Sequence, residues 1–379
     1  MKICHLTSVH SYRDARIFTK ECQSLAAFGH EVHLIAPGAP CEKVNGVFLH
    51  GISPGKGNRL TRMTGTVRQV YKKAVDVDAD VYHFHDPELI TVGLLMKAKG
   101  KKVVYDVHED LPKQIFRKPY IPLYIQKPVS VAIDFIEKNS SRLFDLIICA
   151  TPHICEHFKK YNVRRVTVKN YPRLGAELRP RDEQIGRGNY VCYIGGLSAD
   201  RGLNVMQEAV SFTKSNLYLA GRFFSRKDQN RFKNTTEGQV KYLGFLEKEQ
   251  INELLANSLA GLVVLEENEA FSYSLPVKMF EYMSAGIPVI CSDFPLWREI
   301  VEKYNCGICV DPKNSKQLAE AINYIRDHPE EARLMGENGL KAVQEEYNWE
   351  SESKKLIKAY GMLINFNKKE VNISENSNA

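Results

Sequence analysis

The sequence lacks an uninterrupted apolar run of about eighteen residues, roughly the length that a helix needs to cross a bilayer. Its N-terminus, MKICHLTSVH, turns polar too early for a secretory signal peptide. We therefore expect a cytoplasmic protein that is neither secreted by that route nor inserted in a membrane. Contact with the surface of a membrane stays open.

Paired cysteine motifs are also scarce. Nine cysteines are scattered along the chain, and only Cys306 and Cys309 form a CxxC, with no second pair to complete a zinc site. Several cysteines fall in apolar runs that are typical of buried strands, which indicates reduced core thiols. The loop after the first expected strand, residues 8–17, contains no glycine, so a dinucleotide-binding GxGxxG is absent there.

The totals favour a two-domain soluble protein. A chain of 379 residues is too long for one typical core, and its 44% hydrophobic and 26% charged residues are ordinary for globular domains. The formal net charge of +7 suits anionic ligands or an anionic membrane surface. This charge gives no reason to expect a nucleic acid as partner.

The N-terminal half begins with a strand–helix–strand pattern. Residues 2–9 and 30–37 read as strands, and residues 14–28 have apolar positions at helical spacing and end before a glycine. This order predicts an α/β fold with a parallel, doubly wound sheet. Asp14 and Arg16, in the first connection, could contact a ligand, but structural pairing is the simpler prediction.

Two later strands end in histidine and acid. Residues 80–86 (DVYHFHD) end in His85 and Asp86, and residues 102–110 (KVVYDVHED) end in His108, Glu109 and another acid. Ligands of open α/β sheets lie beyond the carboxyl ends of the strands. The pattern therefore predicts a site for substrate hydroxyls, with a metal site as the alternative.

Two basic segments could lie on an anionic membrane. Residues 54–73 carry six basic and no acidic residues, with apolar positions near helical spacing, and a solvated helix face explains them equally well. Residues 111–138 mix aromatic, proline and basic residues, which suits a lipid headgroup boundary or an irregular lid over the sheet.

The composition predicts five parts of the chain. They are an N-terminal domain (1–172), a linker rich in proline, glycine and charge (173–189), a C-terminal domain (190–348), a C-terminal helix (349–366) and a disordered polar tail (367–379).

The C-terminal domain contains two candidate phosphate-binding turns. The run YIGGLSADRGL is a strand, a Gly-Gly turn and then Arg201 at the opening of a helix. Residues 271–293 read as a loop, a helix with Lys278 and Glu281 in its first turns, a glycine stop and a buried strand. A helix N-terminus with a nearby cation favours a nucleotide-sugar site, although an ordinary αβ unit has the same pattern.

Several motifs together resemble glycosyltransferase family 4. They are HFHDPEL, YDVHED, YIGGL followed by RG, and LPVKMFEYMSAGIPVI followed by VDP, and the resemblance extends to about residue 360. The resemblance implies the GT-B fold, in which two Rossmann-like domains flank a cleft and the last helix packs back on the N-terminal domain. It also implies retaining sugar transfer from a nucleotide donor, with no cofactor and no essential metal.

The resemblance assigns roles residue by residue. His108 matches the histidine near the transferred sugar, and Arg201 matches one of two cations on the donor diphosphate. Gly196 stands where the family carries the other cation, so Lys278 is a candidate replacement. Glu281 matches a ribose-binding carboxylate. Tyr273 stands where the family has a sugar-binding glutamate, so Glu267 or Glu269 would have to take that part.

The complete prediction has three sets of residues. The catalytic set is His108, Arg201 and Lys278. The donor set is Gly195, Gly196, Arg201, Gly221, Arg222, Phe245, Tyr273, Ser274, Leu275, Pro276, Lys278 and Glu281. The acceptor set is His10, His85, Asp86 and Glu109.

The leading hypothesis is a retaining, membrane-peripheral glycosyltransferase of the polysaccharide-biosynthesis branch, acting at the inner face of the plasma membrane. A UDP-sugar is the expected donor and a lipid-linked glycan of a bacterial-type lipopolysaccharide or capsule the expected acceptor. The alternatives are a nucleotide-sugar epimerase of the same fold and a sugar-nucleotide-binding protein without catalysis.

Overall fold

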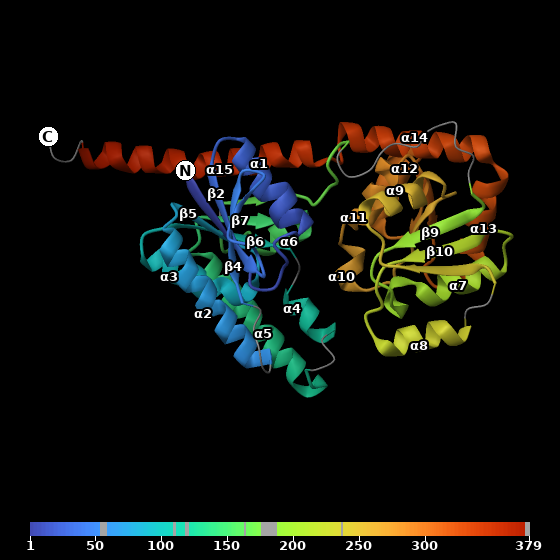
Figure 1. Cartoon of the computed structure of the whole chain (residues 1–379), viewed down its shortest axis with the longest axis horizontal. Coiled ribbons are helices and arrows are strands. Elements are labelled where there is room, and N and C mark those ends of the chain that lie inside the picture. The colour runs from blue at the N-terminus through green and yellow to red at the C-terminus, as the bar shows by residue number, and fades with distance from the viewer. Residues whose placement is uncertain are drawn as a thin grey trace. The chain divides into compact units, whose positions relative to one another are not determined.

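The computed structural model describes residues 1–53, 59–108, 111–117, 121–162, 164–175, 188–235 and 238–375. The chain forms two compact units (Figure 1). Unit 1 comprises Met1–Asn170 with Ser351–Ala379, and unit 2 comprises Tyr171–Glu350. The predicted linker, 173–189, begins just after this boundary, and its residues 176–187 lie outside the described part.

Unit 1 is built on a sheet with the strand order β3-β4-β2-β1-β5-β6-β7-β8, parallel except for the β3–β4 pair. The strands are β1 (Lys2–Leu6), β2 (Glu31–Pro37), β3 (Lys43–Val44), β4 (Val47–Ile52), β5 (Val81–Phe84), β6 (Lys102–Val107), β7 (Leu146–Cys149) and β8 (Arg165–Thr167). The order reverses between β1 and β5, which creates a switch point of the kind where open α/β sheets bind ligands.

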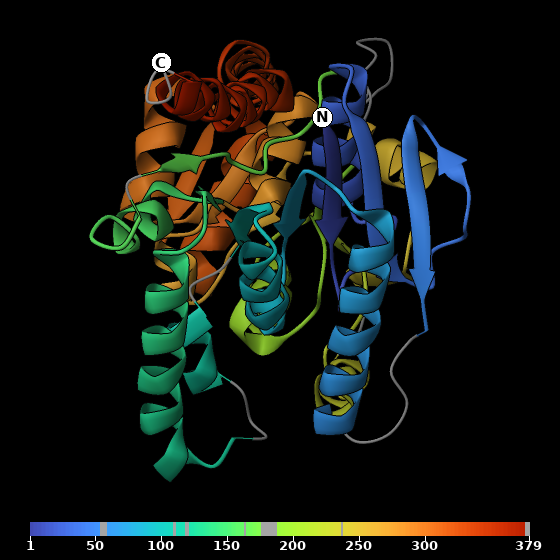
Figure 2. The ribbon, with the colours of Figure 1, turned by 90° about the vertical axis from the view of Figure 1, so that its left-hand side faces the viewer.

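Helices pack on this sheet. They are η1 (Ala15–Cys22), α1 (Gln23–Ala27), α2 (Arg59–Val77), η2 (Pro87–Leu89), α3 (Ile90–Ala98), α4 (Leu111–Gln114), η3 (Ile115–Arg117), α5 (Leu123–Ser141), α6 (Pro152–His157) and α15 (Trp349–Glu375). Figure 2 shows α3 between α2 and α5. The first of the series, η1, is a π-helix, a rare form that occurs frequently at functional sites.

Two predictions for unit 1 need correction. Residues 123–141 form the regular helix α5, with an internal proline, rather than an irregular lid. The segment expected to be a disordered tail is helical as far as Glu375, because no glycine or proline between Met362 and that residue ends α15. The hairpin β3–β4 was not predicted, since its strands are short and mixed in polarity.

Unit 2 has a fully parallel sheet in the order β11-β10-β9-β12-β13-β14. Its strands are β9 (Tyr190–Ile194), β10 (Asn216–Ala220), β11 (Val240–Gly244), β12 (Gly261–Val263), β13 (Val289–Ser292) and β14 (Gly307–Val310). Counted within the unit, this is the order 3-2-1-4-5-6 of the Rossmann fold. Both units are therefore doubly wound, which confirms the predicted fold class.

The helices of unit 2 connect these strands. They are η4 (Ala199–Arg201), α7 (Leu203–Ser211), α8 (Arg226–Thr235), α9 (Lys248–Ala256), α10 (Glu269–Ser272), α11 (Val277–Ser284), α12 (Pro295–Tyr304), α13 (Ser315–Asp327) and α14 (Pro329–Glu345). Cys291 and Cys309 face each other across β13 and β14, with their Sγ atoms 3.8 Å apart, and Cys306 is buried nearby. The CxxC thus contributes thiols to the core.

Among the described residues, no helix combines the length and the apolar character needed to cross a bilayer.

Candidate active site

Glycine turns follow β9, which borders the switch point of unit 2, and its neighbour β10. Gly195 donates its N–H to the Ala220 carbonyl (2.8 Å), and Gly221 donates to Gly244 (2.7 Å). A Cβ atom on Gly221 would lie 1.8 Å from the Gly195 carbonyl oxygen. Only glycine allows this close approach of the two turns.

Arg201 lies beside these turns at the end of η4. Gly202, at φ 74°, ends η4 and leads into α7. The Arg201 guanidinium stacks over the ring of Phe224, 4.9 Å from its centroid. A Cβ atom on Gly196 would lie 2.4 Å from the same ring. Phe224 therefore fills the space that a side chain at Gly196, the position of the family's second cation, would need. It also orients Arg201.

Lys278 supplies a second cation from the first turn of α11. Its Nζ atom is buried, lies 3.8 Å from the centroid of the Tyr193 ring, and has no hydrogen-bond partner in the described part of the chain. It also lies against Gly195, since a Cβ there would come within 2.9 Å of the nitrogen. Burial, with a smaller effect of Arg201, lowers the pKa of Lys278 to about 7, and Glu281 opposes this shift.

The loop before α11 is more ordered than the sequence predicts. It contains the short helix α10, which Asn268 caps by accepting the Phe271 N–H at 2.9 Å. The indole of buried Trp297 donates to the Ser274 carbonyl at 2.7 Å. Pro276 is the N-cap of α11, rather than a residue of its first turn as predicted. These contacts fix the chain just ahead of Lys278.

The remaining donor-set residues lie around the same sheet edge. Arg222, which follows β10, stacks over Phe245, which follows β11, at 4.7 Å. Tyr273 is half exposed beside α10, and Glu281 is partly exposed one turn beyond Lys278 on α11. The side chain of Glu269 lies outside the described residues, so its predicted substitute role stays a prediction.

In unit 1, the carboxyl ends of β1 and β5 are joined by Asp86. Its Oδ2 atom accepts hydrogen bonds from Thr7 Oγ1 (2.7 Å) and the Ser8 N–H (2.6 Å). His10 Nε2 lies 3.3 Å from Asp86 Oδ1 and His10 Nδ1 3.4 Å from Asp14 Oδ2. His10 and Asp86, predicted from separate motifs, are therefore neighbours. The predicted acceptor role of Asp86 needs correction, because its side chain is buried and holds Thr7, Ser8 and His10 in place.

His108 lies at the end of β6 and is anchored by Asp106. His108 Nε2 is 2.7 Å from Asp106 Oδ2. Arg16 donates hydrogen bonds to both oxygens of this buried carboxylate, at 2.9 and 3.1 Å. Burial acts to raise the pKa of Asp106, but the Arg16 guanidinium and His108 hold it well below the usual range. Arg16 is thus a structural partner, as predicted, and Asp14 caps η1.

His85 requires a correction. Its side chain is completely buried, with Nδ1 3.1 Å from Asp106 Oδ2 and Nε2 3.0 Å from His5 Nδ1. The His85 ring lies behind Asp106 instead of facing an acceptor. Alternate residues of a strand point to opposite sides of the sheet, and the short loop after β5 leaves His85 on the buried side. Glu109 lies outside the described residues.

Three residues of this arrangement were missed. Asp106 interrupts an apolar strand and is fully buried, and that interruption was the available signal. Tyr193 and Phe224, which flank the two cations of unit 2, carry no signal, because aromatic residues in and after a buried strand are normal core candidates.

Comparison with known families agrees with the two units. The model described as "Glycosyltransferase Family 4" matches residues 15–170, and the model described as "Glycosyl transferases group 1" matches residues 176–342. Two doubly wound units define the GT-B class. The chain belongs to the GT-B glycosyltransferases of the family 4 type.

Similar proteins share this class. O-antigen chain mannosyltransferase B of Escherichia coli is 25% identical over 51% of each chain. An uncharacterized glycosyltransferase of Methanocaldococcus jannaschii is 23% identical over 95% of this chain and 98% of its own. The matches span about half the length of the first curated relatives. The structure of Anabaena Alr3699/HepE in complex with UDP-glucose has a TM-score of 0.72 at 14% identity, covering 96% of this chain and all of that chain.

Proposed function

We propose that this protein is a retaining glycosyltransferase that moves a sugar from a UDP-sugar to a lipid-linked glycan acceptor, without an essential metal or cofactor, in the synthesis of a bacterial-type surface polysaccharide. The observation that carries the proposal is the pair of cations at the switch point of unit 2. Arg201 is held by aromatic stacking, and the ammonium group of Lys278 has no described hydrogen-bond acceptor. Such a pair is suited to a diphosphate.

The proposed chemistry follows the development of charge. Cleavage of the anomeric C–O bond leaves a cationic sugar and an anionic nucleoside diphosphate. Arg201 and Lys278 stabilise the leaving diphosphate, and cations fixed in advance at that place lower the barrier. Glu281 binds the ribose, and a diphosphate oxygen receives the acceptor proton during attack on the same face of the sugar. No side chain is assigned as a nucleophile.

The histidine end of unit 1 is the proposed acceptor side. His108 is partly exposed and is oriented by Asp106, which Arg16 holds in the charged form. His10 lies beside it and can exchange hydrogen bonds with sugar hydroxyls, since the rings of His10 and His108 are 5.9 Å apart, and the buried Asp86 positions His10.

Two observations guide the choice of substrates. The solved structure of Alr3699/HepE contains UDP-glucose, which supports UDP as the nucleotide. The E. coli relative is named for an O-antigen chain, which supports a surface polysaccharide as the product. A decisive assay incubates the protein with UDP-sugars and a lipid extract. Labelled glycolipid is the expected product, whereas an altered sugar formed from donor alone would indicate an epimerase.

The membrane part of the proposal rests on α2 and α5. Helix α5 exposes the large apolar side chains of Leu123, Tyr124, Val131, Phe135 and Ile136 next to the exposed Lys127. Helix α2 exposes Arg68 and Lys72. Apolar side chains beside basic ones suit the headgroup region of an anionic membrane, which supports the proposed location at the inner face of the plasma membrane.

Flotation with anionic liposomes tests this surface. The wild type should float, and the double substitution Leu123→Ser, Tyr124→Ser should stay at the bottom of the gradient. Phe212→Ser is the matched control, because this half-exposed phenylalanine belongs to unit 2. A wild type that does not float, or a control that loses flotation equally, would reject the membrane surface.

A further inference from the structure

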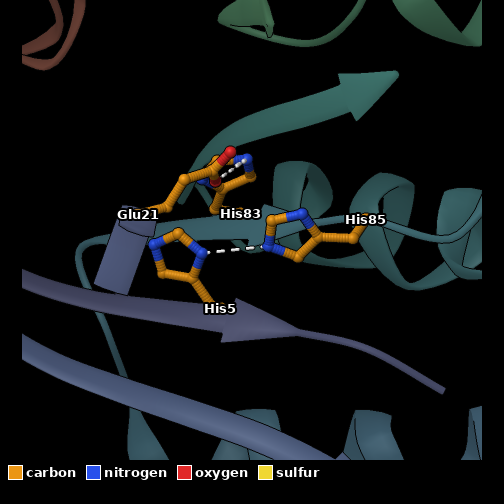
Figure 3. A group of neighbouring side chains, drawn as sticks. All are labelled: His5, Glu21, His83 and His85. Carbon is orange, nitrogen blue, oxygen red and sulfur yellow. Dashed lines mark hydrogen bonds and ion pairs between the residues drawn. The ribbon is translucent and has the colours of Figure 1, made fainter. Parts of the chain in front are cut away.

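The switch point of unit 1 contains a buried cluster that the proposed reaction does not use. His5 from β1, Glu21 from η1 and His83 from β5 have fully buried side chains, and His85 follows β5 (Figure 3). One nitrogen or carboxylate oxygen from each of the four lies within 4.8 Å of the corresponding atoms of the other three. Three imidazoles and a carboxylate converging in this way form a metal-ligand set.

The cluster has more polar atoms than partners. Within the described part of the chain, His5 Nε2, His83 Nε2 and both oxygens of Glu21 are buried without a hydrogen bond of ordinary geometry, and Glu21 Oε1 has an ion pair with Arg16 Nε at 3.1 Å. A buried, unsatisfied polar atom commonly costs about 1–3 kcal/mol. Such atoms gathered in one place need a common explanation. The buried carboxyl groups of Glu21 and Asp106 also share the Arg16 guanidinium, so a cation bound beside Glu21 would offset negative charge.

The outer nitrogens of two histidines are already oriented. His85 Nδ1 lies 3.1 Å from Asp106 Oδ2, and His83 Nδ1 lies 2.8 Å from the Tyr360 hydroxyl of α15. Because a carboxylate accepts, His85 carries its proton on Nδ1, and its Nε2 lone pair faces His5 Nδ1 at 3.0 Å, a contact that a bound metal would replace. Metal-binding histidines are typically fixed in this way by carboxylate or other oxygen partners.

The π-helix η1 brings Glu21 to this place. In a π-helix, residues five apart align, and Arg16 Nε accordingly lies 3.1 Å from Glu21 Oε1. Arg16 therefore binds both Glu21, which belongs to the cluster, and Asp106, which lies behind His85. The rare helix form is explained if the carboxylate must reach the histidines.

We propose that His5, Glu21, His83 and His85 bind a structural zinc ion, with Asp106 and Tyr360 supporting two of the histidines. A ligand set of three nitrogens and one oxygen suits tetrahedral Zn²⁺. Tetrahedral zinc at Zn–N distances of about 2.0–2.1 Å sets its ligand atoms roughly 3.3 Å apart. The four ligand atoms now lie within 4.8 Å of one another, and His83 Nε2 lies 3.8 Å from Glu21 Oε2, so the ligands would have to move inward to reach this spacing.

The site would join β1, β5 and η1, and through Tyr360 it would also tie α15 to the core of unit 1. Its role is structural, because all four ligands are buried and a closed zinc site offers no free position to a substrate. The inference does not depend on the proposed function, since the cations assigned to the diphosphate belong to unit 2.

The test is metal content of protein purified without a metal-affinity tag. We expect about one zinc per chain, loss of thermal stability after chelation, and the visible absorption of tetrahedral cobalt after Co²⁺ replaces zinc. Glu21→Gln and His5→Gln nearly preserve side-chain size and should abolish stoichiometric binding. Tyr360→Phe removes only a supporting partner and should weaken zinc affinity about 10–100-fold.

His30→Gln is the matched control, because His30 belongs to unit 1 but not to the cluster. His33→Gln tests the neighbouring His33–His50 pair, whose nitrogens are 2.8 Å apart. A wild type that contains no metal and gives no cobalt spectrum would overturn the proposal. In that case a proton on Glu21 would neutralise the buried carboxylate. Unchanged zinc content in both ligand variants, or loss of zinc only in His33→Gln, would overturn it too.

Discussion

Lys278 is the most informative single residue of unit 2. It is buried beside an arginine, and its ammonium group has no hydrogen-bond acceptor among the described residues. Ordinary lysines are charged at neutral pH, but burial lowers the pKa of Lys278 to about 7. Such a group is matched to an anion that arrives from outside. It gains its full charge only when the anion replaces the lost hydration.

This arrangement predicts proton uptake when a nucleoside diphosphate binds. At pH 8 the free Lys278 is mostly neutral, and a bound diphosphate raises its pKa, so the protein takes up close to one proton. Affinity for UDP should fall as the pH rises above 7. Titration calorimetry in buffers of different ionisation enthalpy measures the uptake, and Lys278→Met should remove it. Equal uptake in that variant would contradict the assignment.

Arg201 is predicted to act on the transition state. Arg201→Ala should lower kcat by about 100–1000-fold, because removal of one fixed donor to a developing anion costs about 2.7–4 kcal/mol. Its melting temperature should change little, since Arg201 is partly exposed and stacks on the exposed Phe224. Arg333→Ala, at an exposed arginine of α14, is the matched control. Full turnover in folded Arg201→Ala would reject this role.

At the residue scale, the sequence predicts which side chains belong to the candidate site but not which residues contact them. His108, Arg201 and Lys278 stand out because they are polar residues next to strand ends. Their partners Asp106, Phe224 and Tyr193 come from positions that core packing explains equally well. The burial of His85 also depends on the strand's face, which one motif cannot fix.

At the element scale, the turn from η4 to α7 holds Arg201 in place. Gly202 has φ 74°, and a Cβ atom there would lie 1.9 Å from the Val264 carbonyl oxygen. The effect of the positive φ can be separated from that of the contact with Val264. Gly100 has nearly the same φ, 76°, but a Cβ atom there would have nothing within 4 Å.

We expect Gly100→Ala to destabilise the protein by about 1–2 kcal/mol, the usual cost of a left-handed alanine. Gly202→Ala should cost clearly more, because backbone must also move, and it should reduce UDP binding. Urea denaturation compares the two variants. Equal free energies of unfolding would show that the contact with Val264 is not a constraint.

Elements with strong periodicity or a clear stop are predicted well. Strand β2 agrees closely with the predicted residues 30–37, and α11 ends before Gly286 as expected. Short or interrupted elements are not. The hairpin β3–β4, the four-residue helix α10 and the proline-containing α5 depend on tertiary packing that local patterns do not carry.

At the scale of the whole molecule, the two units repeat one design. Each sheet reverses its strand order next to its first strand, and each places its candidate residues at that reversal. The doubly wound fold follows from alternating strands and helices. The buried His5–Glu21–His83–His85 cluster does not, because it joins three segments and a helix type that the sequence gives no means to expect.

The most direct test of the account is calorimetric titration of UDP at pH 7.5 into the wild type, Arg201→Ala and the control Arg333→Ala. The account predicts one binding site in the wild type and the control, and at least about tenfold weaker binding in Arg201→Ala, since loss of a charge-assisted hydrogen bond typically costs 1.5–3 kcal/mol. No heat of binding in the wild type, or equal affinity in all three folded proteins, would contradict the donor site proposed for unit 2.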